Sequence, residues 1–314
     1  MPVYNAARHL DTAVASVAAQ DFADWEFVAV DDGSTDASPE ILARWAARDP
    51  RIRIVSNASN KGQTACLNQG LAECRADWIA RQDADDLSHP ARLASQWHYL
   101  GNHPDTVLLG TQGVLIDDRG VRIGLLDVPE DAASIAWGAP FLNPFLHTAV
   151  MFRRDIVTAS GGYDESFRIA QDYELWTRLA ADHVTTNLSR RLVSYRHAET
   201  SLSKTGRSLA FEEADRVSAR EARRLLGRAW SEEEQALTSS FRRGLDPGLR
   251  AGFVRTIDAI GGEIARPIPP RLRAAWHLRL AGMEGASALS EIRHAMRADA
   301  NFTLCWLRDR FLSS

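Results

Sequence analysis

Three short apolar segments in the first third of the chain each end in a cluster of polar residues, and this pattern constrains the fold most. The segments are WEFVAV at 25–30, RIRIVS at 51–56 and DWIARQD at 77–83. Segments with helical periodicity lie between them, at 38–50 and 62–74. This alternation predicts an α/β fold with a mostly parallel sheet flanked by helices. Because ligands of such sheets bind at the carboxyl ends of the strands, we expect the polar clusters to line one site.

The N-terminus fits this pattern less well. MPVYN, residues 1–5, has the character of a loop that follows a strand, and four or five apolar residues would be expected before it. Either the numbering starts late or the first strand is missing. A missing strand would expose the edge of a neighbouring strand.

The remainder of the chain divides near residue 204. Residues 107–124 predict a strand, a turn and a strand, residues 171–182 predict a helix, and residues 190–203 predict a strand with a polar exit. Beyond 205 the composition shifts to Ala, Arg, Leu and Glu. We therefore predict an α/β domain at 1–204 and a helical C-terminal region at 205–314.

Charge is distributed unevenly between these two parts. Residues 1–203 hold 18 Lys and Arg against 27 Asp and Glu, whereas residues 204–314 hold 19 against 14. An acidic first part argues against nucleic-acid binding, which needs a basic surface, and suits a cleft that recruits a metal ion. The basic part is either a solvated helical face or a peripheral contact with an anionic membrane. Within it, NFTLCWLRDRFL at 301–312 either lies in a lipid interface or covers the core.

Cysteine usage and hydropathy bear on the compartment. The three cysteines include no CxxC pair, which is typical of a reducing environment. The sequence contains neither an apolar run of about 18 residues nor the basic-then-apolar pattern of a signal peptide. We expect a cytoplasmic protein, with peripheral contact at the inner membrane face as a further expectation.

Three carboxylates crowd into four residues at Asp83, Asp85 and Asp86. Like charges this close raise one another's pKa values, so a neighbouring base or a divalent cation is expected there. Closely spaced aspartates supply the oxygen ligands that hard cations prefer. The alternative for Asp86 alone is that it caps the helix that follows.

Taken together and in order, MPVYN, VDDGSTD, NKGQTACLNQG, DADD and QDYELW resemble family 2 inverting glycosyltransferases, which have the GT-A fold. The resemblance covers residues 1 to about 203. It implies an enzyme that transfers a sugar from a nucleotide-sugar donor, a UDP-sugar, to a glycan or lipid-linked acceptor in cell-surface polysaccharide synthesis. It also implies a Mn²⁺ or Mg²⁺ cofactor.

The resemblance assigns donor-side roles to particular residues. Asp85 would ligate the metal, Asp83 would contact the ribose or the metal, and Asp32 would accept a hydrogen bond from the base. Further candidates carry alternatives. Tyr4 packs against the base or is a core aromatic, and Asn5 lies in the same loop. Lys61 with Gly62 approaches the diphosphate or is solvated, and Arg81 contacts the nucleotide or pairs inward with the carboxylates.

Acceptor-side roles are implied in the same way. Asp172 would be the general base, although an aspartate at the start of a helix can also be a structural N-cap. Gln171 departs from the acidic residue that often precedes this base. His197 would contact the metal or the diphosphate, or is an ordinary loop residue. His147 resembles an acceptor-side residue or is a buried histidine at a strand end.

Two other functions are compatible with an α/β sheet of this kind. A sugar-phosphate nucleotidyltransferase would need a Gly-rich, basic loop near the N-terminus, and PVYNAARHL is not one. A non-catalytic binding module with a glycosyltransferase-like fold is the other alternative, and the anomaly at the first strand is what favours it.

Overall fold

The computed structural model describes residues 1–197, 206–244, 250–263 and 269–270, and it divides the chain into two compact units. The first unit comprises Met1–Glu130 and Phe145–Gly206, and the second comprises Asp131–Pro144 and Arg207–Ser314. The second unit thus takes a segment from the middle of the chain as well as the C-terminal region. Cys305 and the segment 301–312, with its expected lipid or core contact, lie outside the described residues.

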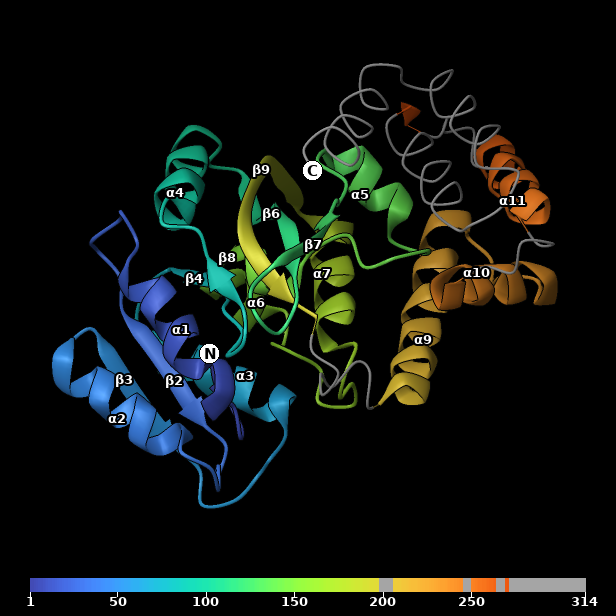
Figure 1. The fold of residues 1–314 in the computed structure, drawn as a ribbon. Helices are drawn as coiled ribbons and strands as arrows, with labels where there is room; N and C mark the ends of the chain where they lie inside the picture. The colour runs from blue at the N-terminus through green and yellow to red at the C-terminus, as the bar shows by residue number, and fades with distance from the viewer. Residues whose placement is uncertain (198–205, 245–249, 264–268, 271–314) are drawn as a thin grey trace. The chain divides into compact units, whose positions relative to one another are not determined.

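The first unit begins with a parallel sheet in the order β1–β2–β3, of which Figure 1 labels β2 and β3. Its strands and helices follow the predicted alternation: β1 Pro2–Val3, α1 Ala7–Ala18, β2 Phe27–Asp31, α2 Ser38–Arg48, β3 Ile52–Ser56 and α3 Gln63–Glu73. Successive residues of β2 point to opposite faces. Phe27 and Ala29 pack in one cluster with residues of α1 and α2, whereas Val28 and Val30 pack with Cys66 of α3. Because both faces are covered, β2 is buried along its whole length.

The second sheet of this unit has the order β4–β8–β6–β9–β5, with β7 paired to β6. The long β6–β9 ladder is parallel, and the shorter pairings are antiparallel. The elements are β4 Trp78–Ala80, β5 Leu87–Ser88, α4 Arg92–Asn102, β6 Thr106–Ile116, β7 Arg122–Leu126, the 3₁₀ helix η1 His147–Ala149, β8 Met151–Arg153, α6 Arg154–Ala159, α7 Gln171–Asp182 and β9 Val184–Arg196. The predicted strand–turn–strand at 107–124 is confirmed as β6 and β7.

The expectation that residues 1–5 lie beyond a strand is wrong for the first residues. Pro2 and Val3 pair with Val30 and Asp31, because the amides of Val30 and Asp32 donate to the carbonyls of Met1 and Val3 at 2.8 Å. The strand is short, and a cavity of about 620 Å³ lined by residues of β2 and β4 adjoins it.

The second unit is helical in its described part. It contains α5 Ala132–Gly138, α9 Arg207–Leu226, α10 Glu232–Gly244 and α11 Arg250–Glu263. Its apolar core is formed by Trp137, Phe141, Leu237, Phe241, Ile257 and Ile260. Among the described residues, no helix combines the length and the apolar character needed to span a membrane.

Candidate active site

Asp32 joins the loop after β2 to the loop after β3. Its carboxylate is 2% exposed and accepts hydrogen bonds from the amides of Lys61 and Gly62, both at 2.9 Å, and from Asn57 Nδ2 at 3.0 Å. Burial alone would raise the pKa of Asp32, but these hydrogen bonds outweigh it and hold the pKa below its usual value. Asp32 is therefore an ionised anchor between two of the polar loops that the sequence predicted would converge.

Two glycines permit this close approach of the loops. Gly33 has φ +71°, and a Cβ there would lie 2.9 Å from the Ser59 backbone. Gly62 has φ +94° immediately before α3. Both positions require the left-handed region that glycine adopts without strain. The side chain of Lys61 is exposed, and its contribution to Asp32 is made by its main chain.

The loop after β1 is tied to the same region. Asn5, at φ +49°, accepts from the amide of Thr35 at 2.8 Å through Oδ1, and its own amide donates to Ser34 Oγ at 3.0 Å. Tyr4 is 50% exposed, so the alternative of a core aromatic is wrong. Tyr4 and Asn5 thus stand beside the loop that carries Asp32.

The three clustered aspartates occupy different electrostatic environments. Burial alone would raise the pKa of Asp83, but the guanidinium of Arg81, with a terminal nitrogen 2.6 Å from Asp83 Oδ1, holds the pKa of Asp83 below its usual value. Burial and then the charge of Asp83 raise the pKa of Asp85 to about 6. Burial and the charges of Asp83 and Asp85 raise the pKa of Asp86 well above its usual value. The cluster therefore holds more negative charge than Arg81 alone relieves.

Asp86 does not cap the following helix. The residue before α4 is Ala91 and makes no side-chain cap, whereas Asp86 Oδ1 accepts from the amide of Arg196 at 2.7 Å. This bond spans 110 residues and fixes the end of β9 against the acidic loop. The Arg196 guanidinium also donates to the carbonyl of Asp85 at 2.9 Å.

A buried arginine, Arg92, donates several hydrogen bonds to the same loop, and the sequence analysis did not identify it. Arg92 is 1% exposed and donates to the carbonyl of Arg81 at 2.7 Å, to Ser88 Oγ at 2.9 Å and to Gln82 Oε1 at 3.1 Å. Its partner four residues later, Gln96, is fully buried. The sequence does contain one indication of this buried role. Arg92 and Gln96 are four residues apart on a helix face that also carries leucines.

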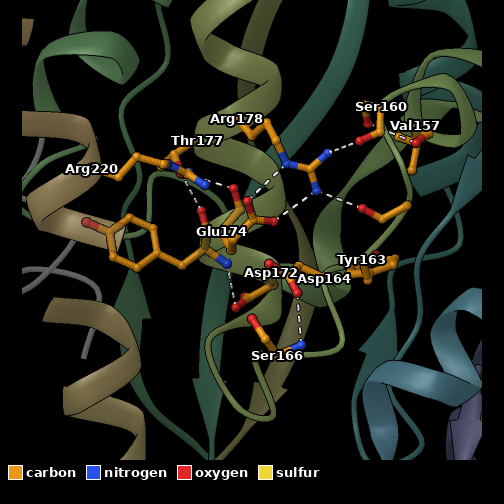
Figure 2. A network of polar contacts seen from close by, with 12 residues as sticks. Val157, Ser160, Tyr163, Asp164, Ser166, Asp172, Glu174, Thr177, Arg178 and Arg220 are labelled. Carbon is orange, nitrogen blue, oxygen red and sulfur yellow. Dashed lines mark hydrogen bonds and ion pairs between the residues drawn. The ribbon is translucent and has the colours of Figure 1, made fainter. Parts of the chain in front are cut away.

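Asp172 lies in the first turn of α7, as predicted (Figure 2). It is partly exposed, and its Oδ1 accepts from the amide of Tyr173 at 2.7 Å. The N-cap position of α7 is Ala170, so Asp172 is not the N-cap residue. Figure 2 also shows Arg178 reaching from α7 to the loop that precedes it, where it donates to the carbonyls of Ser160 at 2.6 Å and Gly162 at 2.7 Å.

The charge of Asp172 acts on the same tyrosine as the charges of the acidic cluster. Burial raises the pKa of Tyr195 first, and the charges of Asp86, Asp83, Asp85 and Asp172 raise it further. The charges of Asp172 and of the three clustered aspartates therefore act on the same phenol group. A cavity shared by Asp32 and Asp172 stays a prediction.

The two histidines differ in environment. His197 is exposed, directly follows Arg196, and donates its amide to the carbonyl of Ile116 at 2.8 Å. His147 is partly buried in η1 and contacts Arg81, with 3.1 Å between Arg81 Nε and His147 Nε2.

A divalent cation fits the acidic cluster chemically. Within the described residues, no three His, Cys, Asp or Glu side chains are already grouped as metal ligands. Asp85 and Asp86 nevertheless have raised pKa values beside Asp83, and a bound cation would relieve that repulsion with oxygen ligands. Asp83 and Asp85 are the residues that would hold it.

The match to a family model decides which proteins this chain is related to. Residues 1–157 match the model described as glycosyl transferase family 2, which is half of the chain. The chain belongs to glycosyltransferase family 2. The predicted resemblance is thereby confirmed, and the acidic loop and the loop carrying Asp32 both fall within the matched residues.

Curated relatives of this family member include bacterial proteins named as glycosyltransferases. The chain is 36% identical over 183 residues to the putative glycosyltransferase EpsE of Bacillus subtilis, which covers 57% of this chain and 64% of the relative. It is 30% identical over 225 residues to the O-antigen biosynthesis glycosyltransferase WbnJ of Escherichia coli, with 70% and 86% covered. The match to EpsE thus spans somewhat less than two thirds of that protein.

Solved structures show the GT-A fold of this family member. TarS 1–349 of S. aureus in complex with UDP-GlcNAc superposes with a TM-score of 0.59 at 16% identity, covering 99% of this chain and 91% of that one. The mannosyltransferase PcManGT of Pyrobaculum calidifontis, in complex with GDP-Man and Mn²⁺, gives 0.53 at 19% identity, covering 96% and 85%. At these identities the likeness establishes the fold alone.

Proposed function

We propose that this chain is an inverting, metal-dependent glycosyltransferase that moves a sugar from a UDP-sugar to a glycan or lipid-linked acceptor in cell-surface polysaccharide synthesis. One observation carries the proposal: the charges of Asp172 and of the aspartates at 83, 85 and 86 all raise the pKa of Tyr195, although these residues come from segments almost ninety residues apart. A nucleotide diphosphate with its cation and an acceptor hydroxyl need carboxylates placed in this way.

The donor side is assigned to the loops after β1, β2, β3 and β4. Asp32 accepts a hydrogen bond from the base, for which the N3–H of uracil is a suitable donor. Tyr4, exposed beside this loop, packs on the base. Asn5 holds that loop in place, and Lys61 with Gly62 faces the diphosphate from the start of α3.

Asp83 and Asp85 would hold the metal ion, and Asp83 would also contact the ribose. Bound there, Mn²⁺ or Mg²⁺ would neutralise negative charge on the diphosphate leaving group. Arg81 acts through its ion pair with Asp83, and His197, exposed at the end of β9, is a further candidate contact for the metal or the diphosphate.

Asp172 deprotonates the acceptor. Its carboxylate takes the proton of the acceptor hydroxyl while that oxygen attacks the anomeric carbon. The bond from the anomeric carbon to the diphosphate oxygen breaks in the same displacement, so the configuration inverts and the nucleoside diphosphate leaves. The first turn of α7 favours an ionised carboxylate, because the helix dipole places partial positive charge there.

Relatives and solved structures support the choice of substrates. EpsE and WbnJ are named as glycosyltransferases, the latter of O-antigen biosynthesis. TarS has been solved with UDP-GlcNAc and PcManGT with GDP-Man and Mn²⁺. UDP-sugars are therefore the first donors to test, and GDP-sugars the second.

A donor screen tests the proposal. The protein is incubated with UDP-, GDP- and dTDP-sugars, Mn²⁺ and membrane glycolipid extract, and release of the nucleoside diphosphate is measured. We expect release from a UDP-sugar, its loss in Asp172→Asn, and its retention in Asp182→Asn, which changes an exposed aspartate at the other end of the same helix. Full activity of Asp172→Asn would remove the proposed base, and binding of a nucleoside triphosphate in place of UDP would favour a nucleotidyltransferase.

A further inference from the structure

The Arg81 guanidinium is buried at the point where β4 ends and the acidic loop begins. Arg81 is 4% exposed, and its main chain is held on both sides, since its amide donates to the carbonyl of Val150 at 2.9 Å and its carbonyl accepts from Arg92 at 2.7 Å. One terminal nitrogen donates to Asp83 Oδ1 at 2.6 Å, and the other to the carbonyl of Gln82. A buried guanidinium needs partners for its N–H groups, and these two contacts leave the Nε–H to be satisfied.

That Nε–H donates to His147 Nε2 at 3.1 Å. An arginine N–H can only donate, so Nε2 must be the unprotonated ring nitrogen and the ring proton must sit on Nδ1. Burial and the neighbouring Arg81 lower the pKa of His147 to about 3, which agrees with a neutral ring. The direction of this hydrogen bond therefore assigns His147 a neutral ring with its proton on Nδ1.

Neighbouring aromatic groups fix the position of the ring. The rings of Tyr163 and Trp176 each lie with their centroids 5.9 Å from that of His147, and the Tyr163 hydroxyl is 3.3 Å from Nε2. The next residue of η1, Thr148, accepts from the amide of Asp83 at 3.2 Å through its hydroxyl oxygen. The turn formed by η1 thus contacts the side chain of Arg81 and the main chain of Asp83 at once.

A neutral acceptor suits this position better than a charged one. A carboxylate in place of the imidazole would compete with Asp83 for the guanidinium, and a lysine would repel it. The imidazole satisfies the Nε–H without cancelling the positive charge, so that charge stays directed at Asp83. Because Arg81 donates to Oδ1 of Asp83, it limits the orientations that this carboxylate can adopt.

We propose that His147 is a positioning residue of the donor site, which holds Arg81 through a neutral acceptor nitrogen so that Arg81 fixes Asp83 for the ribose and the metal ion. The assignment of Asp83 to the donor rests on the proposed function, whereas the contact between His147 and Arg81 does not. The resemblance-based reading of His147 as an acceptor-side residue is a different role, and the two are separable by experiment.

The contact is tested first without substrate, by ¹⁵N NMR of the histidine side chains near neutral pH, with His147→Leu used to assign the resonance. We expect a neutral ring protonated on Nδ1, and an Arg81 Nε–H resonance that is protected from exchange in the wild type and lost in His147→Leu. A ring protonated on Nε2, or a charged ring, would overturn the contact.

The consequence is tested with three further measurements: the donor KM, kcat, and the Mn²⁺-dependent affinity for UDP. His147→Leu removes the acceptor and should raise the donor KM and the UDP dissociation constant about tenfold, the usual cost of a lost hydrogen bond to a charged group. His147→Gln keeps a neutral acceptor and should largely restore both, and His147→Glu should be as impaired as His147→Leu. His98→Leu, at an exposed histidine of α4, is the matched control and should behave as the wild type.

Two results would refute the positioning role: equal impairment of the Gln and Leu variants, or a changed acceptor KM with an unchanged donor KM. Melting temperatures of the Gln and Leu variants within ~3 °C of each other would exclude general unfolding as the cause. A wild type that binds neither UDP nor Mn²⁺ would refute the proposed function and the donor-side role together, while the NMR result would still decide whether His147 holds Arg81.

Discussion

Replacing Asp32 by asparagine should destabilise the first unit, because Asp32 accepts three hydrogen bonds while almost fully buried. Lys61 and Asn57 donate to Oδ1, and Gly62 donates to Oδ2. Asparagine supplies one acceptor oxygen and one NH₂ group, so the Gly62 amide would face another donor. One charge-assisted hydrogen bond is lost and one buried N–H is left unsatisfied, which together cost ~2–4 kcal/mol.

The assay is thermal unfolding at neutral pH followed by tryptophan fluorescence. For a unit of this size, ~2–4 kcal/mol corresponds to a melting temperature lowered by roughly 5–15 °C. Asp31→Asn is the matched control: Asp31 is also buried, but within the part of the chain that the structure describes its side chain accepts a single hydrogen bond, from the amide of Ser34 to Oδ1 at 3.2 Å, which asparagine retains. Its melting temperature should fall by at most ~3 °C.

The pH dependence gives a second check on the same residue. Since the pKa of Asp32 is lowered in the fold, its contribution to stability is present above the unfolded pKa of about 4 and is lost as the pH falls through the folded value. The difference between the wild type and Asp32→Asn should therefore shrink in acid. Equal melting temperatures of the two proteins at neutral pH would refute the reasoning.

Three charged residues, Asp85, Glu234 and Arg178, give the remaining predictions. The pKa of Asp85 is about 6 in the fold, so its contribution to stability falls as the pH rises from about 4 to about 6. Mn²⁺ should therefore raise the melting temperature more at pH ~7.5 than at pH ~5. An equal rise at both pH values would contradict this. Asp85→Asn should melt no lower than the wild type without metal and should not respond to Mn²⁺. Hydrogen bonds from Arg228 and Ser231 outweigh burial and lower the pKa of Glu234 to about 2. Glu234→Gln should therefore lower the free energy of unfolding at neutral pH by ~1–2 kcal/mol, a value reduced because Arg228 is partly exposed to solvent. This loss should disappear as the pH falls from about 4.5 towards 2. Arg178→Lys cannot hold Glu174 and two carbonyl groups together and should cost ~3 kcal/mol by the same measurement; a stable variant would show that the network in Figure 2 adds little.

The alternating part of the fold was predictable because its periodicity is local. Each face of β2 meets a different helix layer, so its continuous apolar run identified a buried strand without reference to its partners. The helix at 171–182 was equally visible, and α7 has those bounds. The inclusion of 131–144 in the second unit was not predicted, because the composition does not change at its boundaries.

The site was predictable in its acidic residues and not in what holds them. Because a helix follows Asp86, a local cap was one of its two expected roles, but its main-chain partner is Arg196, 110 residues later. Arg92 and His147 support Arg81 through contacts that exist only once α4, η1 and β4 have packed together. A single sequence carries composition and spacing, and such long-range partners for buried polar groups are determined by tertiary packing.

Calorimetric titration of UDP into the full chain, with Mn²⁺ and with a chelator, tests the central claim most directly. We predict binding with Mn²⁺, weakened at least about tenfold by chelation or by Asp85→Asn, because the clustered carboxylates need a cation between them and the diphosphate. Absence of UDP binding under every condition, or binding indifferent to both the chelator and the substitution, would contradict the account.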